Sequence, residues 1–266
     1  SLTKLGGGTL TLAGANTYNG ATAVSAGILA IANKDAISGT SGITVGTAAT
    51  STTSLRIDVA NGTSTTIGSG KSVTVRGLGS GNLGALLGAD STAVTWAGGI
   101  VIGDTTGARI GGGVNGTLTV DGIISESAAG SSLLFSRAAG STTILNNVNT
   151  YTGDTQFFMG GNTTTLKMGI ANAINNSSRV ALSSATTGTG YFDLNGYNQN
   201  VRAIADTVTG DLVVTNSSTS SDAELKLSTT TAESFNGWIQ DGASKKTSLV
   251  ITGTGSQNFS GTNTYT

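Results

Sequence analysis

The chain contains no proline, no cysteine and no histidine, and only a tenth of its 266 residues are charged. The lack of cysteine excludes disulfides, thiolate nucleophiles and cysteine metal sites. The lack of histidine removes the side chain best suited to acid–base work near neutral pH and the commonest metal ligand. Proline cannot donate to a β ladder, so its absence fits a chain whose strands are paired on both sides.

Charge and hydropathy exclude further classes of protein. Thirteen basic and 14 acidic residues give a net charge of −1 and are spread evenly, so no basic patch predicts binding of nucleic acid. No apolar run approaches the roughly 18 residues of a membrane helix, so we expect no membrane insertion by this segment. Ser1 lies directly beside a repeat motif, so we expect no signal peptide within this segment. We therefore expect a segment of a longer repetitive protein or one fibre subunit.

What the chain does contain is glycine, at 41 residues, and short runs in which apolar and polar residues alternate. Such alternation predicts half-buried strands. A sandwich, a barrel and a solenoid all fit this rhythm, and the missing proline and the recurring turns favour the solenoid. The predicted inward pairs are Leu10/Leu12, Ile43/Val45, Leu55/Ile57, Val73/Val75, Leu118/Val120, Leu166/Met168, Val180/Leu182, Phe192/Leu194, Leu225/Leu227 and Leu249/Ile251.

One stretch of sequence is repeated. Residues 1–19 align without gaps on residues 248–266 with eight of nineteen positions identical, so the chain ends in the phase in which it begins. A looser copy occupies residues 140–153. The residues of the repeat motif are Gly8, Leu10, Leu12, Gly14, Asn16, Tyr18 and Gly20 in the first copy, Asn149, Tyr151 and Gly153 in the second, and Asn263 and Tyr265 in the third.

The repeat resembles the passenger-associated transport repeat, also called the autotransporter-associated β-strand repeat. Residues 8–12, 14–20 and 22–29 match its strand, its Asn-Thr-Tyr turn and its second strand pair, and residues 192–201 resemble another coil of the family. The resemblance implies a secreted right-handed β-helix, usually the extracellular passenger of a bacterial autotransporter.

We therefore expect an all-β fold, a single right-handed parallel β-helix over residues 1–266. Motif copies lie near residues 3–31, 137–168 and 248–266. At about 20 residues per coil, the chain makes roughly 13 coils and a rod of about 60 Å. Residues 32–39, 81–90 and 168–176 resist the strand pattern and are expected to form short loops or helical turns.

No set of residues points strongly to catalysis. Hydrolysis of a glycoside needs two carboxylates about 5 to 9.5 Å apart. Asp222 and Glu224 share a strand face, but with Lys226 they are better interpreted as a solvated surface. Two glycine patterns, at residues 79–84 and 111–116, have dinucleotide-fingerprint spacing without its strand–helix context. We expect no enzyme, no cofactor and no metal site.

The leading functional hypothesis is an extracellular structural module: a stalk, a spacer or a fibre-forming passenger on a bacterial surface or in a secreted protein. Its expected partners are copies of itself, or further coils that continue the solenoid end to end. The alternative is an adhesin that binds host or matrix glycans through its flank, its loops or a row of Tyr18, Tyr151 and Tyr265. A polysaccharide-degrading enzyme is the third hypothesis.

Overall fold

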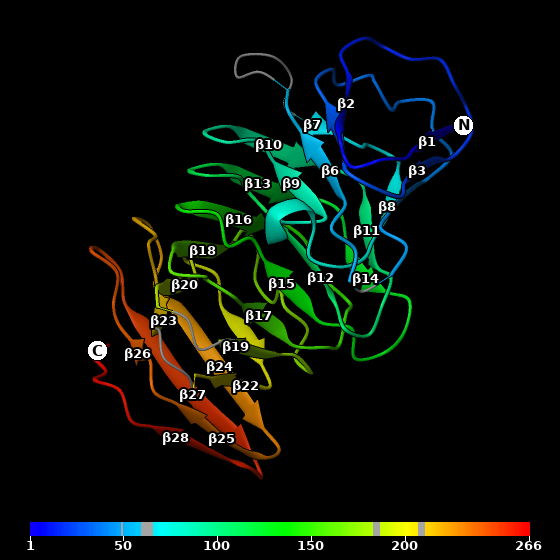
Figure 1. The fold of residues 1–266 in the computed structure, drawn as a ribbon. Helices are drawn as coiled ribbons and strands as arrows, with labels where there is room; N and C mark the ends of the chain where they lie inside the picture. The colour runs from blue at the N-terminus through cyan, green and yellow to red at the C-terminus, as the bar shows by residue number, and fades with distance from the viewer. Residues whose placement is uncertain (49, 60–65, 183–186, 207–210) are drawn as a thin grey trace.

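The computed structural model describes residues 1–48, 50–59, 66–182, 187–206 and 211–266. Short strands follow one another around a coil, and each pairs in parallel with strands of the turns before and after it (Figure 1). No α-helix occurs in these ranges, and one 3-10 turn, η1 (Ser80–Asn82), is present. The predicted all-β parallel solenoid is confirmed.

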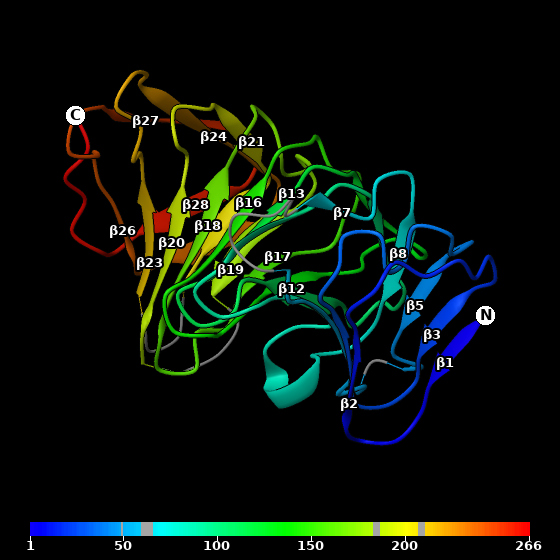
Figure 2. The ribbon, with the colours of Figure 1, turned by 90° about the horizontal axis from the view of Figure 1, so that it is seen from above.

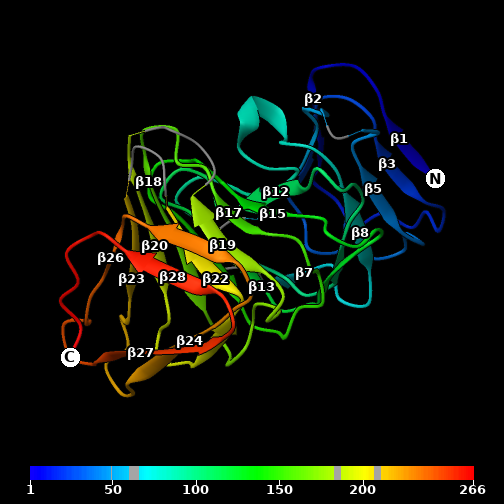
Figure 3. The same ribbon diagram turned by 90° about the horizontal axis from the view of Figure 1, so that it is seen from below.

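The stacked strands build three walls. Figures 2 and 3 show the two chain ends at opposite ends of the stack. The first wall contains β1 (Leu2–Lys4), β3 (Thr22–Val24), β5 (Ile43–Val45), β8 (Ser72–Val75), β11 (Gly99–Ile102) and β14 (Ile124–Glu126), and a second group of β21 (Gln199–Val201), β24 (Ala223–Thr229) and β27 (Thr247–Gly253).

The second wall is the longest. It contains β2 (Thr9–Leu12), β4 (Ile28–Ile31), β6 (Ser54–Ile57), β9 (Leu86–Gly88), β12 (Ala108–Gly111), β15 (Leu133–Phe135), β17 (Thr155–Phe157), β19 (Arg179–Leu182) and β22 (Ala203–Ala205). A bridge between Asp206 and Phe235 extends it to β25 (Ala232–Phe235) and β28 (Ser256–Phe259).

The third wall begins in the third coil. It contains β7 (Thr66–Ile67), β10 (Ala93–Trp96), β13 (Thr117–Val120), β16 (Ser141–Leu145), β18 (Thr163–Met168), β20 (Thr189–Asp193), β23 (Asp211–Thr215) and β26 (Trp238–Ile239). In the first two coils and in the last coil, turns take the place of a third-wall strand.

The coils are longer and fewer than the sequence predicted. Leu2 and Leu249 occupy the same place on the first wall, and about ten turns separate them. One turn therefore takes roughly 25 residues, within the usual range for solenoid repeats. The prediction of 13 coils was wrong because a spacing near 20 holds only at the start. Leu2 pairs with Thr22 there, whereas the step from Leu55 to its partner Leu86 is much longer. Ten turns at about 4.8 Å give a stack of about 50 Å.

The core runs down the centre of the coil. Eight of the ten predicted inward pairs have both members buried, among them Leu55/Ile57 and Leu225/Leu227. The exceptions are Leu10/Leu12 and Leu249/Ile251, which lie in the first and last coils and are covered by a neighbouring coil on one side only. Alternation therefore identified the inward positions correctly, while their burial depends on how many coils flank them.

Irregular segments lie at the corners between walls. Residues 32–39 and 169–176 contain bends and turns and no strand, as expected. Met168 is the last residue of β18. The prediction of a loop over residues 81–90 was wrong in part. Leu86 and Gly88 belong to β9 and pair with Leu55 and Ile57 of the coil before. The η1 turn just before them lies outside the wall and covers Arg109, which donates to the Asn82 carbonyl at 2.6 Å.

Candidate functional site: the asparagine turns and the contacts between coils

The three Asn-Thr-Tyr turns do not all fall on the same wall. The first follows β2 and the third follows β28, both on the second wall, so both turns lie where a third-wall strand would stand. The second follows β16 of the third wall and falls on the first wall. The expectation of equivalent turns is correct for copies one and three, and copy two is displaced by one wall. The interval from Asn16 to Asn149 is therefore not a whole number of coils.

Asn149 shows what the turn does in the middle of the stack. Its buried side-chain amide accepts from the Ile124 N–H at 2.7 Å and donates to the Ala173 and Asn147 carbonyls at 2.8 and 3.0 Å. Ile124 belongs to the preceding coil and Ala173 to the following one. The amide thus completes the hydrogen-bond ladder where the wall has no strand. A buried amide with all its groups bonded avoids the cost of unpaired polar atoms.

The Gln199 side chain makes equivalent hydrogen bonds to backbone in the region of Ala173. Its side-chain oxygen accepts from the Ala173 N–H at 2.9 Å, and its amide nitrogen donates to the Ile170 carbonyl at 2.9 Å. The first wall therefore runs from β14 through Asn149 and Ala173 to β21 without a gap in its bonding. The sequence did not predict that the Asn149 side chain joins three coils.

The asparagines of the first and third motif copies make some of the hydrogen bonds that Asn149 makes. Asn16 donates to the Gly14 carbonyl at 3.2 Å and to the Ala36 carbonyl of the next coil at 3.0 Å. Asn263 donates to the Gly261 carbonyl at 3.2 Å and accepts from the Ile239 N–H of the preceding coil at 2.9 Å. Each end asparagine thus bonds the single coil beside it, in the geometry that Asn149 uses on both sides.

The motif tyrosines pack at their turns and do not form a row. The Tyr18 hydroxyl pairs with Thr22 Oγ1 at 2.8 Å and the Tyr151 hydroxyl with Thr155 Oγ1 at 2.6 Å. Tyr151 is fully buried, and burial raises the pKa of its hydroxyl. Tyr265 in the last coil is 37% exposed. Because the three rings lie in different coils and one is buried, they offer no continuous surface for a glycan.

Two motif glycines mark close contacts between coils. A Cβ placed on Gly20 would lie 2.6 Å from the Ser1 nitrogen, and one on Gly153 would lie 2.3 Å from the Ser131 carbonyl group. Real Cβ atoms do not approach backbone this closely, so a larger residue at either position would require the neighbouring backbone to move. Gly8 and Gly14, in contrast, have nothing within 4 Å of such a Cβ.

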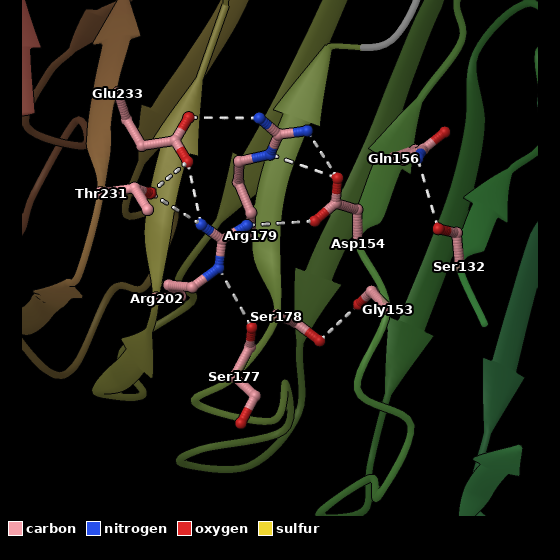
Figure 4. Close-up of polar contacts among 10 residues, drawn as sticks. All are labelled: Ser132, Gly153, Asp154, Gln156, Ser177, Ser178, Arg179, Arg202, Thr231 and Glu233. Carbon is pink, nitrogen blue, oxygen red and sulfur yellow. Dashed lines mark hydrogen bonds and ion pairs between the residues drawn. The ribbon is translucent and has the colours of Figure 1, made fainter. Parts of the chain in front are cut away.

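A network of four charged side chains crosses the outside of the second wall (Figure 4). Arg179 bonds Asp154 at 2.6 Å and Glu233 at 3.2 Å, while Arg202 lies 2.9 Å from Glu233 and 3.5 Å from Asp154. Burial raises the pKa of the Glu233 carboxyl, but the bonds and charges of the two arginines outweigh it and hold that pKa below its usual value. The two carboxylates and two guanidinium groups neutralise one another's charge. Because they come from different coils, their ion pairs link these coils.

The carboxylates of Asp222, Asp104 and Asp121 each accept hydrogen bonds from neighbouring groups. Asp222 accepts from the Lys246 N–H at 2.9 Å. Asp104 accepts from the N–H and the hydroxyl of Thr106, and these bonds hold the pKa of its carboxyl below the usual value. Asp121 accepts from Asn146 at 2.8 Å. Among the residues that the structure describes, no group of three or more Asp or Glu side chains is placed to hold a metal ion.

Arg109 on β12 is a buried cation that the sequence did not single out. Its guanidinium lies 4.8 Å from the centre of the Phe158 ring and donates to the Asn82 carbonyl. Burial, and secondarily the charge of Arg137, lower its pKa to about 10. The side chain fixes the η1 turn to the second wall. The sequence pattern around a single arginine in a strand does not predict such a role.

Two of the predicted loops border shallow hollows. Residues 32–39 contribute Lys34, Asp35 and Ser38 to a hollow of about 350 Å³. Residues 168–176 contribute to a hollow of about 280 Å³ lined by Val148, Asn149, Asn172, Ile174, Asn175, Asn176 and Asn200. The second hollow has no charged residue in its lining.

The fold and these contacts define a parallel β-solenoid whose coils are joined by backbone ladders, side-chain amides and ion pairs. The family model for the passenger-associated-transport-repeat matches residues 2–31, from β1 to β4. This match and the solenoid fit the passenger repeats of autotransporters, as the resemblance predicted. A repeat of this kind indicates a secreted or surface protein.

No curated protein and no solved structure matches the chain. Within the described ranges, no helix is both long and apolar enough to cross a membrane.

Proposed function

We propose that residues 1–266 serve as an extracellular structural module, a spacer or stalk built from stacked coils. The observation that supports this role is the bonding of the first wall at Asn149 and Ala173, where side-chain amides replace a missing strand. A wall that stays bonded through its irregular coils resists opening at those coils. The motif asparagines thereby maintain one continuous stack, which is what a spacer requires.

A spacer tolerates the removal of one whole coil. Val94 and Leu118 are neighbours on adjacent coils, so deleting residues 95–118 joins Val94 to Thr119 and keeps every wall in register. The shortened chain is expected to fold cooperatively with a stack about 5 Å shorter. Deleting residues 95–106 is the matched control, because it removes about half a coil and joins β10 of the third wall to β12 of the second, so the strands no longer meet their partners in the neighbouring coils. A whole-coil deletion that unfolds, or that abolishes a binding or catalytic activity, contradicts the spacer role.

The second candidate function is glycan binding at the hollow beside residues 168–176. The side-chain oxygens of Asn172 and Asn175 accept from the N–H groups of Asn200 and Ser177, at 3.1 and 2.9 Å. Their amide nitrogens therefore remain to donate to hydroxyl or carboxylate oxygens of a sugar. A glycan array on residues 1–266 tests this function. Asn176→Ala is expected to weaken binding, and Asn19→Ala, an exposed asparagine outside the hollow, is the control.

Enzymatic activity is the weakest proposal, and we expect none. A screen of polysaccharide substrates tests it directly. Turnover that Asp222→Ala abolishes would revive the third hypothesis.

A further inference from the structure

The hollow beside residues 168–176 lies where the first wall is interrupted. Between β14 and β21 the chain passes this wall twice, at Asn149 and at Ala173, without forming a strand. The hollow of about 280 Å³ is lined by residues of these two coils and by Asn200 of β21. Sites for small molecules begin at about 300 Å³, so this hollow suits a group of the size of a sugar ring.

The asparagines of the hollow have their oxygens bonded within the chain. Asn172 Oδ1 accepts from the Asn200 N–H at 3.1 Å, and Asn175 Oδ1 accepts from the Ser177 N–H at 2.9 Å. Because a backbone N–H can only donate, these bonds fix which atom of each amide is the oxygen. Asn200 Oδ1 in turn accepts from the Ser228 hydroxyl at 2.9 Å. Within the described ranges the three amide nitrogens make no hydrogen bond, so each is available to a ligand.

The lining favours a ligand rich in hydrogen-bond acceptors. It contains three amide nitrogens that can donate and no carboxylate. A ligand carboxylate only accepts, so it matches these donors, and a sugar hydroxyl can accept from them as well. Val148, which is 48% exposed, and the buried Ile174 add an apolar contact for the C–H groups of a ring.

A lysine without a partner lies beside the hollow on the next coil. Lys226 of β24 pairs in register with Asn200. Its strand neighbours Leu225 and Leu227 are buried, so its side chain points outward on the face that Asn200 shares. Neighbouring strands are about 4.8 Å apart, and the four-carbon stem of a lysine spans that distance. Lys226 makes no hydrogen bond or ion pair with the residues that the structure describes.

The nearest carboxylate on the same strand lies away from the hollow. Glu224 precedes Lys226 by two residues, and its N–H donates to Asn198 Oδ1 at 2.8 Å. Asn198 comes before β21 and is not part of the lining. The turn that forms the hollow lies alongside the opposite end of β21, where the Arg202 N–H donates to the Ser178 carbonyl at 2.9 Å. The hollow is therefore closer to the lysine than to the glutamate.

We propose that this hollow and Lys226 bind acidic glycans, with the carboxylate of a uronic-acid residue between the Lys226 ammonium and the Asn200 amide. Hydroxyl oxygens of the same ring accept from the amides of Asn172 and Asn175. A hydrogen bond to an ionised partner is about twice as strong as a neutral one, so the carboxylate distinguishes acidic from neutral sugars. This inference rests on the glycan-binding function proposed above and names the chemical class of its ligand.

An array of uronic-acid oligosaccharides, each spotted beside its carboxyl-reduced neutral form, tests the ligand class on residues 1–266. Titration calorimetry then measures the affinity of the oligosaccharides that bind. The acidic form is expected to bind about fivefold more tightly than the neutral form, as a single exposed ion pair allows. Lys226→Gln is expected to weaken binding of the acidic form about fivefold and to leave binding of the neutral form unchanged.

Lys246→Gln is the matched control, because it makes the same change of charge one coil further on. Lys246 is exposed, its N–H donates to Asp222, and it does not line the hollow. The control is expected to bind like the unchanged chain. Circular dichroism and the thermal midpoint show whether each variant is folded, and no change is expected at these outward-facing lysines.

Equal losses in Lys226→Gln and Lys246→Gln would reveal a general attraction to surface charge and overturn the site. Equal affinity for acidic and neutral forms, with Asn176→Ala weakening both, also overturns the preference for acids but leaves glycan binding at the hollow in place. A chain that binds no sugar of either form contradicts the glycan-binding function and this inference together.

Discussion

The coil that contains Asn149 and the coil that contains Asn16 hold the same turn with different numbers of neighbours. In the middle coil the amide bonds both adjacent coils, Tyr151 is buried and Gly153 is pressed against backbone. In the first coil Asn16 and Tyr18 are half-buried, and a Cβ placed on Gly14 would have nothing within 4 Å. The comparison shows that one sequence motif is either core or surface according to the coils around it. Substitutions at matched positions separate the two cases.

The largest difference is expected at the glycines. Gly153→Val places a Cβ about where the Ser131 carbonyl group lies, so two coils must separate. We expect a loss of about 3 kcal/mol or more in the free energy of unfolding. Gly14→Val has open space and is expected to change that free energy by less than about 0.5 kcal/mol. Urea unfolding followed by circular dichroism measures both, and equal losses would show that the contact at Gly153 relaxes easily.

The asparagines give the next effect. Asn149→Ala leaves the Ile124 N–H without its acceptor and removes two donated bonds inside the stack. Each buried polar group left unpaired costs about 1–3 kcal/mol, so we expect a loss of about 3 kcal/mol. Asn16→Ala removes bonds that water replaces at the open face and is expected to cost less than about 1 kcal/mol. Hydrogen exchange at the Ile124 amide distinguishes a local opening from a global loss.

The sequence predicted the class of fold and most inward positions, because alternation is a local property of each strand. It did not predict the number of coils, since corner turns such as the one that follows residue 78 lengthen a coil without a signal in the strands. Nor did it place copy two of the motif on the correct wall, because an Asn-Thr-Tyr turn fits any wall of the coil. The bonds of Asn149 and Gln199, and the burial of Arg109, arise between residues of adjacent coils that lie far apart in sequence. These contacts depend on the coil length, which the pattern of alternating residues does not predict.

The tyrosines sharpen the comparison with a smaller change. Tyr151→Phe keeps the ring and removes one buried hydroxyl, leaving Thr155 Oγ1 without that partner at full burial. We expect a loss of about 1 kcal/mol. Tyr18→Phe removes the equivalent bond to Thr22 at a half-buried ring and is expected to cost a few tenths of a kcal/mol. Thermal unfolding of the pair checks the order. A larger loss for Tyr18→Phe would mean that the first coil is more tightly packed than its exposure indicates.

The smallest effect is expected at the ion pairs of the second wall. The arginines hold the pKa of the Glu233 carboxyl below its unfolded value near 4.5. A carboxyl with a lowered folded pKa stabilises the protein fully above its unfolded pKa, and this stability is lost as the pH falls through the folded pKa. Glu233→Gln is therefore expected to destabilise the chain by less than about 1 kcal/mol at pH 7 and to reduce the loss of stability below pH 4.5. The matched control is Glu224→Gln, since Glu224 makes no ion pair among the described residues. Denaturant titrations at pH 7 and pH 3.5 test the sign, and an equal pH response in the two variants would assign the acid sensitivity to other carboxylates.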